Sequence, residues 1–317
     1  ERGNRVFPES DQAEEVVRTL YDSMLQAGVK AIKSNPVKGI VIENGQVKGV
    51  DCEQGMISAQ AVIICTGGMS YPGTGSTGDG YHWASAAGHS IVEPRPGLVP
   101  LLVREEWVQD LQGLSLKNTQ ATAFNAEGKK ITQDFGELLF THFGLSGPII
   151  LSMSHDIGEY LYRKKKQVSI ELDLKPALSE EKLDERLQRD LDKYSRKRIK
   201  NALDDLLPQK MIPVIIKLSG IEPDKVCHQI NRSERLTLVH LLKHLHMIIH
   251  GTRPIAEAIV TAGGVNVKEI DPKTMQSKLV KGLFFAGEVL DIDGYTGGYN
   301  LQAAFSTGYL AGKYAAL

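Results

Sequence analysis

The stretch KGLFFAGEVLDIDGYTGGYNLQAAFSTGYLAGKYAA, residues 281–316, combines a short apolar segment, a glycine-rich segment and an amphipathic segment in direct succession. Residues 283–286 have the uninterrupted apolar character of a strand in a parallel sheet. Gly287 and Glu288 follow at its carboxyl end, where open α/β sheets bind ligands. A Gly-Gly pair at 297–298 then precedes a helical pattern. The stretch therefore predicts a strand, loop and helix of an α/β domain, with a ligand site in the loop.

The start of the predicted helix offers N–H groups that have no helical acceptor, together with a partial positive charge. The two glycines lack Cβ atoms, so a planar ligand can lie against the backbone. A reduced flavin carries negative charge near N1 and its C2 carbonyl, and such donors would stabilise it. Glu288 would accept hydrogen bonds from ribityl hydroxyls. The alternative is a tight connection in which Glu288 is only a surface charge.

Residues 73–80, GTGSTGDG, match the G-x-G-x-x-G fingerprint of a dinucleotide-binding turn. That turn requires a strand that runs directly into its first glycine. The apolar run AVIIC ends at Cys65, and residues 69–72, which include a proline, separate it from the glycines. We therefore expect a glycine-rich loop and then a helix that begins near Asp79, and not a phosphate loop.

Length and composition describe an ordinary globular protein. The 317 residues allow two or three domains, and a formal charge of −1 gives no overall field for nucleic acid or an anionic membrane. Three cysteines without a C-x-x-C pair indicate a reducing compartment, so we expect a cytoplasmic protein. No apolar run approaches the roughly 18 to 20 residues of a membrane span. We expect a small-molecule substrate and neither a membrane nor a nucleic-acid partner; the sequence gives no prediction of oligomeric state.

The character of the sequence changes several times along the chain. An Asn-Gly turn at 44–45 predicts a β-hairpin, and leucines at 183, 187 and 191 recur with helical spacing. The order of segments predicts an α/β domain interrupted by a β-rich domain that itself carries a helical insert. The segments are 1–97 (α/β), 98–175 (β-rich), 176–244 (helical insert), 245–262 (β-rich) and 263–317 (α/β).

Several motifs together resemble a known protein family. They are AVIICTGGMSYPGTGSTGDGY (61–81), PGLVPLLV (96–103), GELLFTHFGLSGPIIL (136–151), VTAGGV (260–265) and GLFFAGEVLDIDGYTGGYNLQAAFSTG (282–308). The combination resembles the family of predicted NAD(P)/FAD-dependent flavoproteins that includes BaiN-like proteins and aminoacetone oxidases, and the resemblance runs from Gly3 to the last helix. It implies an α/β fold class in which an incomplete FAD-binding Rossmann-like domain is interrupted by a β-barrel-like domain with a helical insert.

The resemblance implies FAD as the cofactor and NAD(P)H as a candidate electron donor. Cys65 stands where alanine is expected, and we expect it to pack as a small buried residue. The implied cofactor contacts are Val37 on the adenine side, Thr66, Gly67 and Gly68 at the FAD backbone, Gly287 and Glu288 at the ribityl and pyrophosphate region, and Gly298, Asn300 and Leu301 at the pyrimidine ring.

In this family the dinucleotide fingerprint belongs to a strand, turn and helix at the start of the protein, and residues 1–317 do not contain that unit. Such a unit takes about 30 residues or more. Because it forms the main cradle for the pyrophosphate, we expect residues 1–317 by themselves to be a truncated chain that binds FAD poorly or not at all and is inactive.

A flavoenzyme needs few catalytic side chains because the cofactor performs the difficult chemistry. We expect an FAD-dependent oxidoreductase in which a small substrate, such as an amine, or NAD(P)H gives a hydride to flavin N5. His142 is the side chain that we expect to face the flavin from the barrel side and to move a proton near neutral pH. A structural, hydrogen-bonded histidine is the alternative. Tyr295 and Tyr299 are candidates for the substrate pocket or for packing.

Three other interpretations concern single features. A fumarate-reductase-like flavoenzyme would need substrate-binding arginines, for which Arg253 is the candidate. The basic character of the helical insert allows a nucleic-acid-binding role. His240 and His244 are four residues apart, as zinc ligands can be, but no glutamate follows His240, so we predict no metal site.

Overall fold

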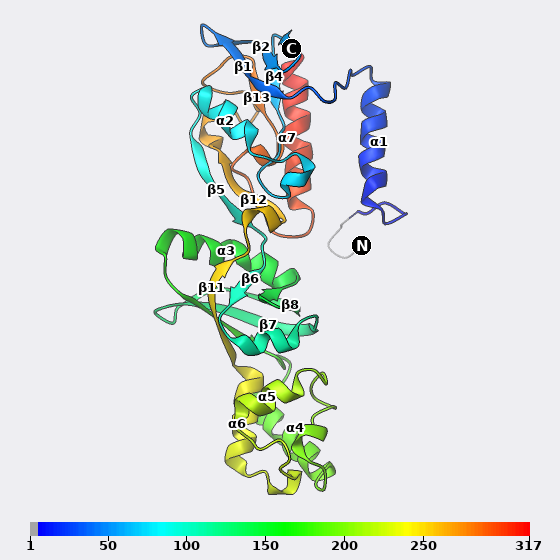
Figure 1. Ribbon diagram of the computed structural model, residues 1–317, viewed down its shortest axis with the longest axis vertical. Helices are drawn as coiled ribbons and strands as arrows, with labels where there is room; N and C mark the ends of the chain where they lie inside the picture. The colour runs from blue at the N-terminus through cyan, green and yellow to red at the C-terminus, as the bar shows by residue number, and fades with distance from the viewer. Residues whose placement is uncertain (1–5) are drawn as a thin grey trace. The chain divides into compact units, whose positions relative to one another are not determined.

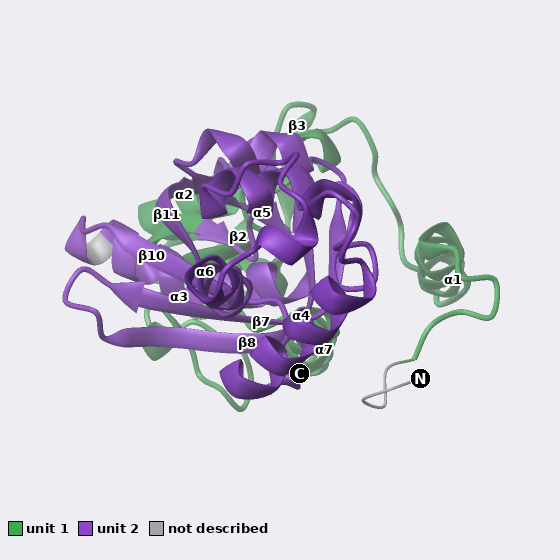
Figure 2. Ribbon diagram, turned by 90° about the horizontal axis from the view of Figure 1, so that it is seen from below, with its two compact units in different colours: residues 1–95, 261–317 green, residues 96–260 purple. Residues whose placement is uncertain are grey.

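The structure is a computed structural model that describes residues 6–317, apart from the side chain of Arg163. The first five residues, which belong to the predicted 1–97 segment and include Gly3, lie outside the described residues. The chain forms two compact units (Figure 2). Unit 1 comprises residues 1–95 and 261–317, and unit 2 comprises residues 96–260.

Unit 1 contains a parallel strand pair, β4 (Val62–Ile64) and β13 (Leu283–Phe285). The helix α7 (Tyr299–Ala315) packs against this pair, and α2 (Asp79–Ala86) follows β4 along the chain (Figure 1). All of β13 is buried, as its apolar sequence predicts. The predicted strand, loop and helix of the opening stretch are therefore confirmed.

The rest of unit 1 consists of short antiparallel or two-stranded pieces and a separate helix. The Asn-Gly turn joins the first two strands of a three-stranded antiparallel sheet, so the predicted hairpin is confirmed. No residue of the first helix is buried. These elements are α1 (Ala13–Gln26), β1 (Val37–Glu43), β2 (Gln46–Cys52), β3 (Gly55–Ser58) and the pair β5 (Ile91–Gly97) with β12 (Val260–Val265).

Unit 2 contains a closed barrel in the strand order β10-β11-β6-β9-β8-β7, with antiparallel neighbours. Burial alternates along β10, as expected for a strand with one face toward a core. The predicted β-barrel is confirmed. The strands are β6 (Leu101–Val103), β7 (Ser115–Asn125), β8 (Lys130–Phe140), β9 (Gly144–Ser146), β10 (Val168–Asp173) and β11 (Leu245–Thr252), and α3 (Pro148–Lys164) packs on β8.

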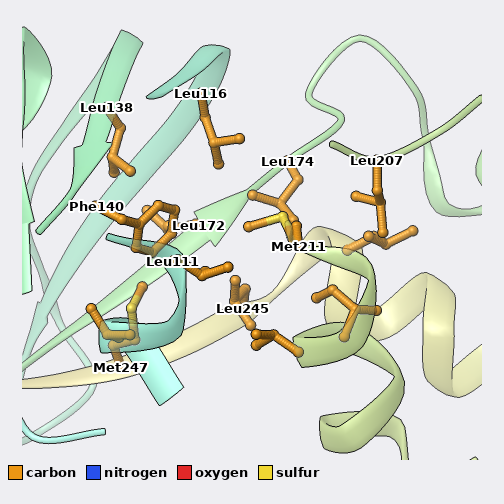
Figure 3. Packing of buried hydrophobic residues seen from close by; sticks show 14 of the residues in the cluster. Leu111, Leu116, Leu138, Phe140, Leu172, Leu174, Leu207, Met211, Leu245 and Met247 are labelled. Atoms are coloured by element: carbon orange, nitrogen blue, oxygen red, sulfur yellow. The ribbon is translucent and has the colours of Figure 1, made fainter. Parts of the chain in front are cut away.

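The helical insert leaves the barrel after β10 and returns at β11. Its helices are α4 (Glu180–Lys193), α5 (Ile212–Ser219) and α6 (Arg232–Lys243). The leucines at 183, 187 and 191 are buried, which confirms the helical pattern. Asn231 and Glu234 form a capping box at the start of α6. Figure 3 shows the shared core, in which Leu207 and Met211 of the insert belong to the same apolar cluster as barrel residues such as Phe140.

Short 3-10 helices occupy several connections: Pro72–Thr74, Glu106–Leu111, Ile199–Asn201, Cys227–Gln229, Ile255–Glu257, Val267–Glu269 and Gly287–Val289. Among residues 6–317, no helix combines the length and the apolar character that crossing a membrane requires.

Candidate functional site

The loops after β4 and β13 begin at the same edge of their sheet because the two strands are parallel. Ile64 is the register partner of Phe285, and the next N–H along, that of Ala286, donates to the carbonyl of Ile64 at 3.1 Å. The loop after β4 carries the predicted residues 66–68, and the turn after β13 carries Gly287 and Glu288. The structure therefore brings these two predicted groups together.

Hydrogen bonds from Glu288 and Thr261 tie the two loops together. The Ser70 hydroxyl donates to Glu288 Oε1 at 3.0 Å, and the Thr261 N–H donates to the same oxygen at 2.9 Å. Thr261 Oγ1 accepts the N–H groups of Met69 at 2.7 Å and Ser70 at 3.1 Å. The motifs that include Thr261 and Ser70 are visible in the sequence, but nothing in it assigned these two residues a role.

Gly68 is a glycine because the protein itself fills the space beside it. A Cβ atom at this position would lie 2.2 Å from Thr261 Oγ1 and 2.6 Å from Glu288 Oε1. Gly67, next to it, has φ of 72°, a left-handed conformation that favours glycine. In α2, a Cβ at Gly80 would lie 2.2 Å from Thr66 Oγ1. These close approaches fix the path of the loop.

The start of α7 is held by side chains of the same helix. Gly298 is its N-cap residue, with φ of 93°. The Asn300 side chain accepts the Gly294 N–H at 2.8 Å and donates to the Gly294 carbonyl at 2.9 Å. The Gly287 N–H donates to Thr307 Oγ1 at 3.0 Å. Both groups of the Asn300 side-chain amide are thus bonded to the loop. The contact that we predict between Asn300 and the flavin ring would therefore come from the backbone N–H of Asn300.

Two buried polar atoms near these loops have no hydrogen-bond partner among the described residues: Thr66 Oγ1 and the Tyr81 hydroxyl. Burial raises the pKa of Tyr81 above its ordinary value, and the carboxylates of Glu288 and Asp291 raise it further. The phenol therefore stays protonated and can donate. A buried polar group without a partner costs about 1 to 3 kcal/mol, so these hydroxyls call for a water or a ligand.

Large apolar side chains around the start of α7 are exposed over much of their surface. Leu301 is 63% exposed, and Tyr295, Tyr299 and Phe305 are also exposed. Of the residues of α7, only Ala311 is buried. Exposed apolar surface of this kind is typical of a binding site.

The structure corrects the expectation for Cys65, because the residue is exposed at the surface and is not packed in the core. It follows β4 directly, at the edge where the loops begin. Neighbouring atoms nevertheless cover much of the sulfur, and this burial raises the pKa of the thiol. The thiolate is therefore disfavoured, and Cys65 is not an activated nucleophile.

The glycine-rich run at 73–80 behaves as expected. The strand before it ends at Ile64, and the run opens with the 3-10 helix Pro72–Thr74. Gly75 and Gly78 are left-handed, and α2 begins at Asp79. The prediction of a loop followed by a helix is confirmed.

Val37 lies apart from the other predicted contacts in the fold. It begins β1, in the three-stranded sheet, opposite Cys52.

A cavity of about 760 Å³ is lined by residues including Lys48, Lys281 and Tyr314. Because Lys281 precedes β13, this cavity lies at the amino ends of the parallel strands, away from the loops that carry Gly68 and Glu288.

His142 is exposed in unit 2, with its ring 4.8 Å from that of Phe143. The Arg253 guanidinium lies over the same Phe143 ring, 4.7 Å from its centroid. Arg253 Nε donates a hydrogen bond to Glu257 Oε2 at 2.7 Å. Arg253 chiefly lowers the pKa of Glu257. The arginine that a fumarate-reductase-like enzyme would need is therefore engaged by a carboxylate.

His244 is held by carboxylates. Its Nδ1 lies 3.0 Å from Glu171 and its Nε2 lies 2.9 Å from Glu180. Although burial opposes the charged form, hydrogen bonds with Glu180 and Glu171 raise the pKa of His244. In the part of the chain that the structure describes, no cluster of three or more His, Cys, Asp or Glu side chains could hold a metal ion.

Many cations of the helical insert face carboxylates. The pairs include Lys193 with Asp205, Arg198 and Lys200 with Asp224, Lys225 with Glu234, and Arg235 with Asp184. This pairing reduces the positive charge that the insert would present to a phosphate backbone.

Elsewhere in unit 1, the buried His89 side chain joins the half-buried Glu269 and the buried Ser277 in a Glu-His-Ser chain. Its Nδ1 lies 3.1 Å from Glu269 Oε2, and its Nε2 lies 2.8 Å from Ser277 Oγ. Ser277 Oγ also accepts the N–H groups of Leu279 and Val280. The hydroxyl proton of Ser277 therefore points to Nε2, and Nδ1 carries the ring proton. Burial lowers the pKa of His89, against the opposing effect of Glu269.

We predict that His89→Gln weakens the pH dependence of stability between about pH 7.5 and 5.5. The unfolded histidine has a pKa near 6.5, and the folded value is lower, so the neutral ring stabilises the fold above about pH 6.5 and this stabilisation is lost as pH falls. Hydrogen bonds from Ser90 lower the pKa of Glu269, so its own contribution is lost only at more acidic pH.

Urea unfolding at several pH values measures this effect. The wild type should lose more unfolding free energy than His89→Gln across the interval. His82→Gln, which changes an exposed histidine of α2, serves as the matched control and should retain the wild-type slope. Equal slopes for all three proteins would contradict a buried neutral His89.

Comparison with known proteins identifies the family. The family model described as HI0933-like protein Rossmann domain matches residues 1–314. The chain therefore belongs to the HI0933-like family. Together with the six-stranded barrel, this match confirms the predicted fold class, a Rossmann-like domain of the FAD-binding type interrupted by a β-barrel.

Curated relatives have two different names. The chain is 31% identical over 317 residues to the 3-dehydro-bile acid delta(4,6)-reductase of Clostridium scindens. The aligned region covers 99% of this chain and 76% of the relative. It is 35% identical over 304 residues to the ribosomal RNA dihydrouridine synthase of Haemophilus influenzae, covering 94% of this chain and 71% of the relative. The Escherichia coli protein with the same name is 31% identical over 306 residues, with the same coverage of 94% and 71%.

Solved structures overlap more weakly. Mycobacterium smegmatis Sdh1 in complex with UQ1 has a TM-score of 0.37 and 18% identity, covering 96% of this chain and 45% of that chain. Aquifex aeolicus GidA in its form I crystal has a TM-score of 0.36 and 14% identity, covering 94% and 49%. The chain spans about half the length of these solved chains, and overlap at this level carries no argument about function.

Proposed function

We propose that the protein is an FAD-dependent oxidoreductase. The observation that supports this most strongly is the pair of loops at the carboxyl ends of β4 and β13, joined through Glu288 and placed beside the start of α7. Ligands of open α/β sheets bind at this edge. Membership of a Rossmann-domain family supports a dinucleotide as the ligand. The narrower assignment to BaiN-like proteins is part of the same proposal.

The residues at this edge fit a flavin nucleotide. Glu288 Oε2 takes no hydrogen bond from the described residues and would accept one from a ribityl hydroxyl. Thr66 Oγ1 has no partner, which fits a polar ligand at the loop. Gly298, without a Cβ atom, and the first N–H groups of α7 would hold the pyrimidine edge. The exposed side chain of Leu301 would pack on it.

FAD would supply two-electron hydride chemistry when bound, with NAD(P)H as the proposed donor. The protein's own part would be to bind and orient. The positive end of α7 would stabilise negative charge at the pyrimidine edge. His142 is the proposed group for moving a proton on the substrate side.

The names of the curated relatives favour a reduction. One relative is named as a delta(4,6)-reductase of a 3-dehydro-bile acid, and the other is named for making dihydrouridine, a hydrogenated base. We therefore extend the proposal to reduction of a carbon–carbon double bond conjugated with a carbonyl group. The cofactor held by Glu288 and Gly298 would supply the hydride for one carbon, with NAD(P)H as the electron source, and a proton would add to the other carbon. An amine that gives its hydride to the flavin is the alternative substrate.

Anaerobic mixing of the complete product of the gene that encodes residues 1–317 tests this proposal. NADPH or NADH should bleach the flavin absorption. Addition of an acceptor with a reducible double bond should then restore the absorption. Unmodified ribosomal RNA, a steroid with a conjugated 3-keto-4-ene group, and an amine without NAD(P)H are the probes. Recovery with RNA or the steroid would support the reduction and name the substrate class. Bleaching by the amine without NAD(P)H would replace the proposed reduction with amine oxidation. No bleaching by NADPH, NADH or the amine would contradict an oxidoreductase.

A further inference from the structure

Thr261 occupies the centre of the hydrogen-bond network at the candidate site. It is fully buried in β12, and its Oγ1 accepts two consecutive backbone N–H groups, those of Met69 and Ser70, at 2.7 and 3.1 Å. These residues are more than 190 positions away along the chain. One side-chain oxygen thus holds the end of the loop after β4.

The direction of each remaining hydrogen bond follows from the number of protons available. A carboxylate only accepts, so the single hydroxyl proton of Ser70 goes to Glu288 Oε1. Ser70 Oγ and Thr261 Oγ1 lie 3.2 Å apart. Because Ser70 has no second proton, Thr261 donates to Ser70 in this pair. The Thr261 hydroxyl therefore accepts two hydrogen bonds and donates one.

This network determines how Glu288 is used. Its Oε1 receives the Ser70 hydroxyl and the Thr261 N–H, at 3.0 and 2.9 Å. Its Oε2 receives no hydrogen bond from the described residues. The two carboxylate oxygens therefore have separate tasks: Oε1 holds the protein together, and Oε2 is left for a ligand.

We propose that Thr261 is a positioning residue of the cofactor site. It holds the loop at 66–70 by two N–H bonds, and through Ser70 it holds Glu288 with Oε2 available to a ribityl hydroxyl. The identity of that ligand rests on the proposed function. The effect of Thr261 on the loop does not depend on the proposed function. An experiment can therefore test the role of Thr261 in the loop separately from the identity of the ligand.

Hydrogen exchange measures the effect on the loop without any cofactor. Thr261→Val keeps the shape of the side chain but removes the acceptor, and the amides of Met69 and Ser70 should exchange about tenfold faster, as expected for the loss of an ordinary hydrogen bond. Thr261→Ser keeps the hydroxyl and should restore slow exchange. Thr274→Val is the matched control, because Thr274 Oγ1 also accepts a backbone N–H in unit 1, that of Gln276 at 3.2 Å.

FAD titration of the complete gene product measures the effect on the site. Thr261→Val should raise the FAD dissociation constant about tenfold or more, and Thr261→Ser should bring it back near the wild-type value. Ser70→Ala removes the link to Glu288 but leaves both N–H bonds to Thr261. It should weaken FAD binding while the amide of Met69 stays protected.

The outcomes separate this inference from the proposed function. Unchanged exchange at Met69 and Ser70 in Thr261→Val would overturn the role of Thr261 in the loop. Faster exchange with unchanged FAD affinity would overturn its role in positioning the site. If the wild-type protein takes up no FAD, the proposed function fails and the ligand half of the inference fails with it, while the exchange data still decide the loop half.

Discussion

Gly68→Ala should abolish or strongly weaken FAD binding and destabilise unit 1. The new methyl group would lie 2.2 Å from Thr261 Oγ1 and 2.5 Å from Thr261 Cβ, and Thr261 is fully buried and cannot move aside. Overpacking of a buried site costs about 1 to 3 kcal/mol. The displacement falls on the residue that holds both the loop and Glu288, so we expect FAD affinity to drop by about tenfold or more.

Thermal unfolding and FAD fluorescence quenching of the complete gene product measure the two effects. Gly312→Ala is the matched control, because Gly312 lies in α7 with open space where its Cβ would be. Alanine is favoured over glycine in a helix by about 1 kcal/mol, so this variant should be at least as stable as the wild type and bind FAD equally well. Wild-type melting and FAD affinity for Gly68→Ala would contradict the close packing of the loop.

Phe140→Ala should destabilise unit 2 by about 3 to 5 kcal/mol, the range for removing a buried phenylalanine side chain. Phe140 ends β8, is fully buried, and lies among core residues such as Leu172 and Met247 (Figure 3). Its loss would leave a cavity in the apolar cluster that barrel and insert share. We therefore expect the barrel and the insert to lose stability together.

Phe135→Ala is the matched control because it removes the same side chain from the same strand where it is 56% exposed. It should change stability by only about 0.5 kcal/mol. The chain has two tryptophans, Trp83 in unit 1 and Trp107 against the unit 2 core. Urea unfolding is therefore followed by tryptophan fluorescence in a Trp83→Phe background, where Trp107 reports on unit 2 alone. Equal losses for both variants would contradict the placement of the two side chains.

Local patterns predicted the elements that short-range chemistry determines. The Asn-Gly turn at 44–45 gave a hairpin because few residues adopt the required backbone conformation. The leucines of α4 gave a buried helix face because their spacing matches the helical period. The apolar run before Gly287 gave β13 for a different reason, because a parallel strand that is buried on both faces is nearly continuous in apolar residues.

The contacts that organise the site could not be predicted in this way. The Thr261 and Glu288 interactions with Ser70 join residues separated by more than 190 positions, and no local pattern encodes such a pairing. The commitment of the Asn300 amide to Gly294 depends on the path of the loop. Cys65 was wrongly expected to be buried because its apolar strand neighbours gave no sign that the chain reaches the surface there.

The visible absorption spectrum of the complete gene product, as purified, tests directly for a bound flavin. We expect the two-banded spectrum of an oxidised flavin, or its appearance when FAD is added to the protein. A colourless protein that takes up no added FAD would contradict an FAD-dependent oxidoreductase.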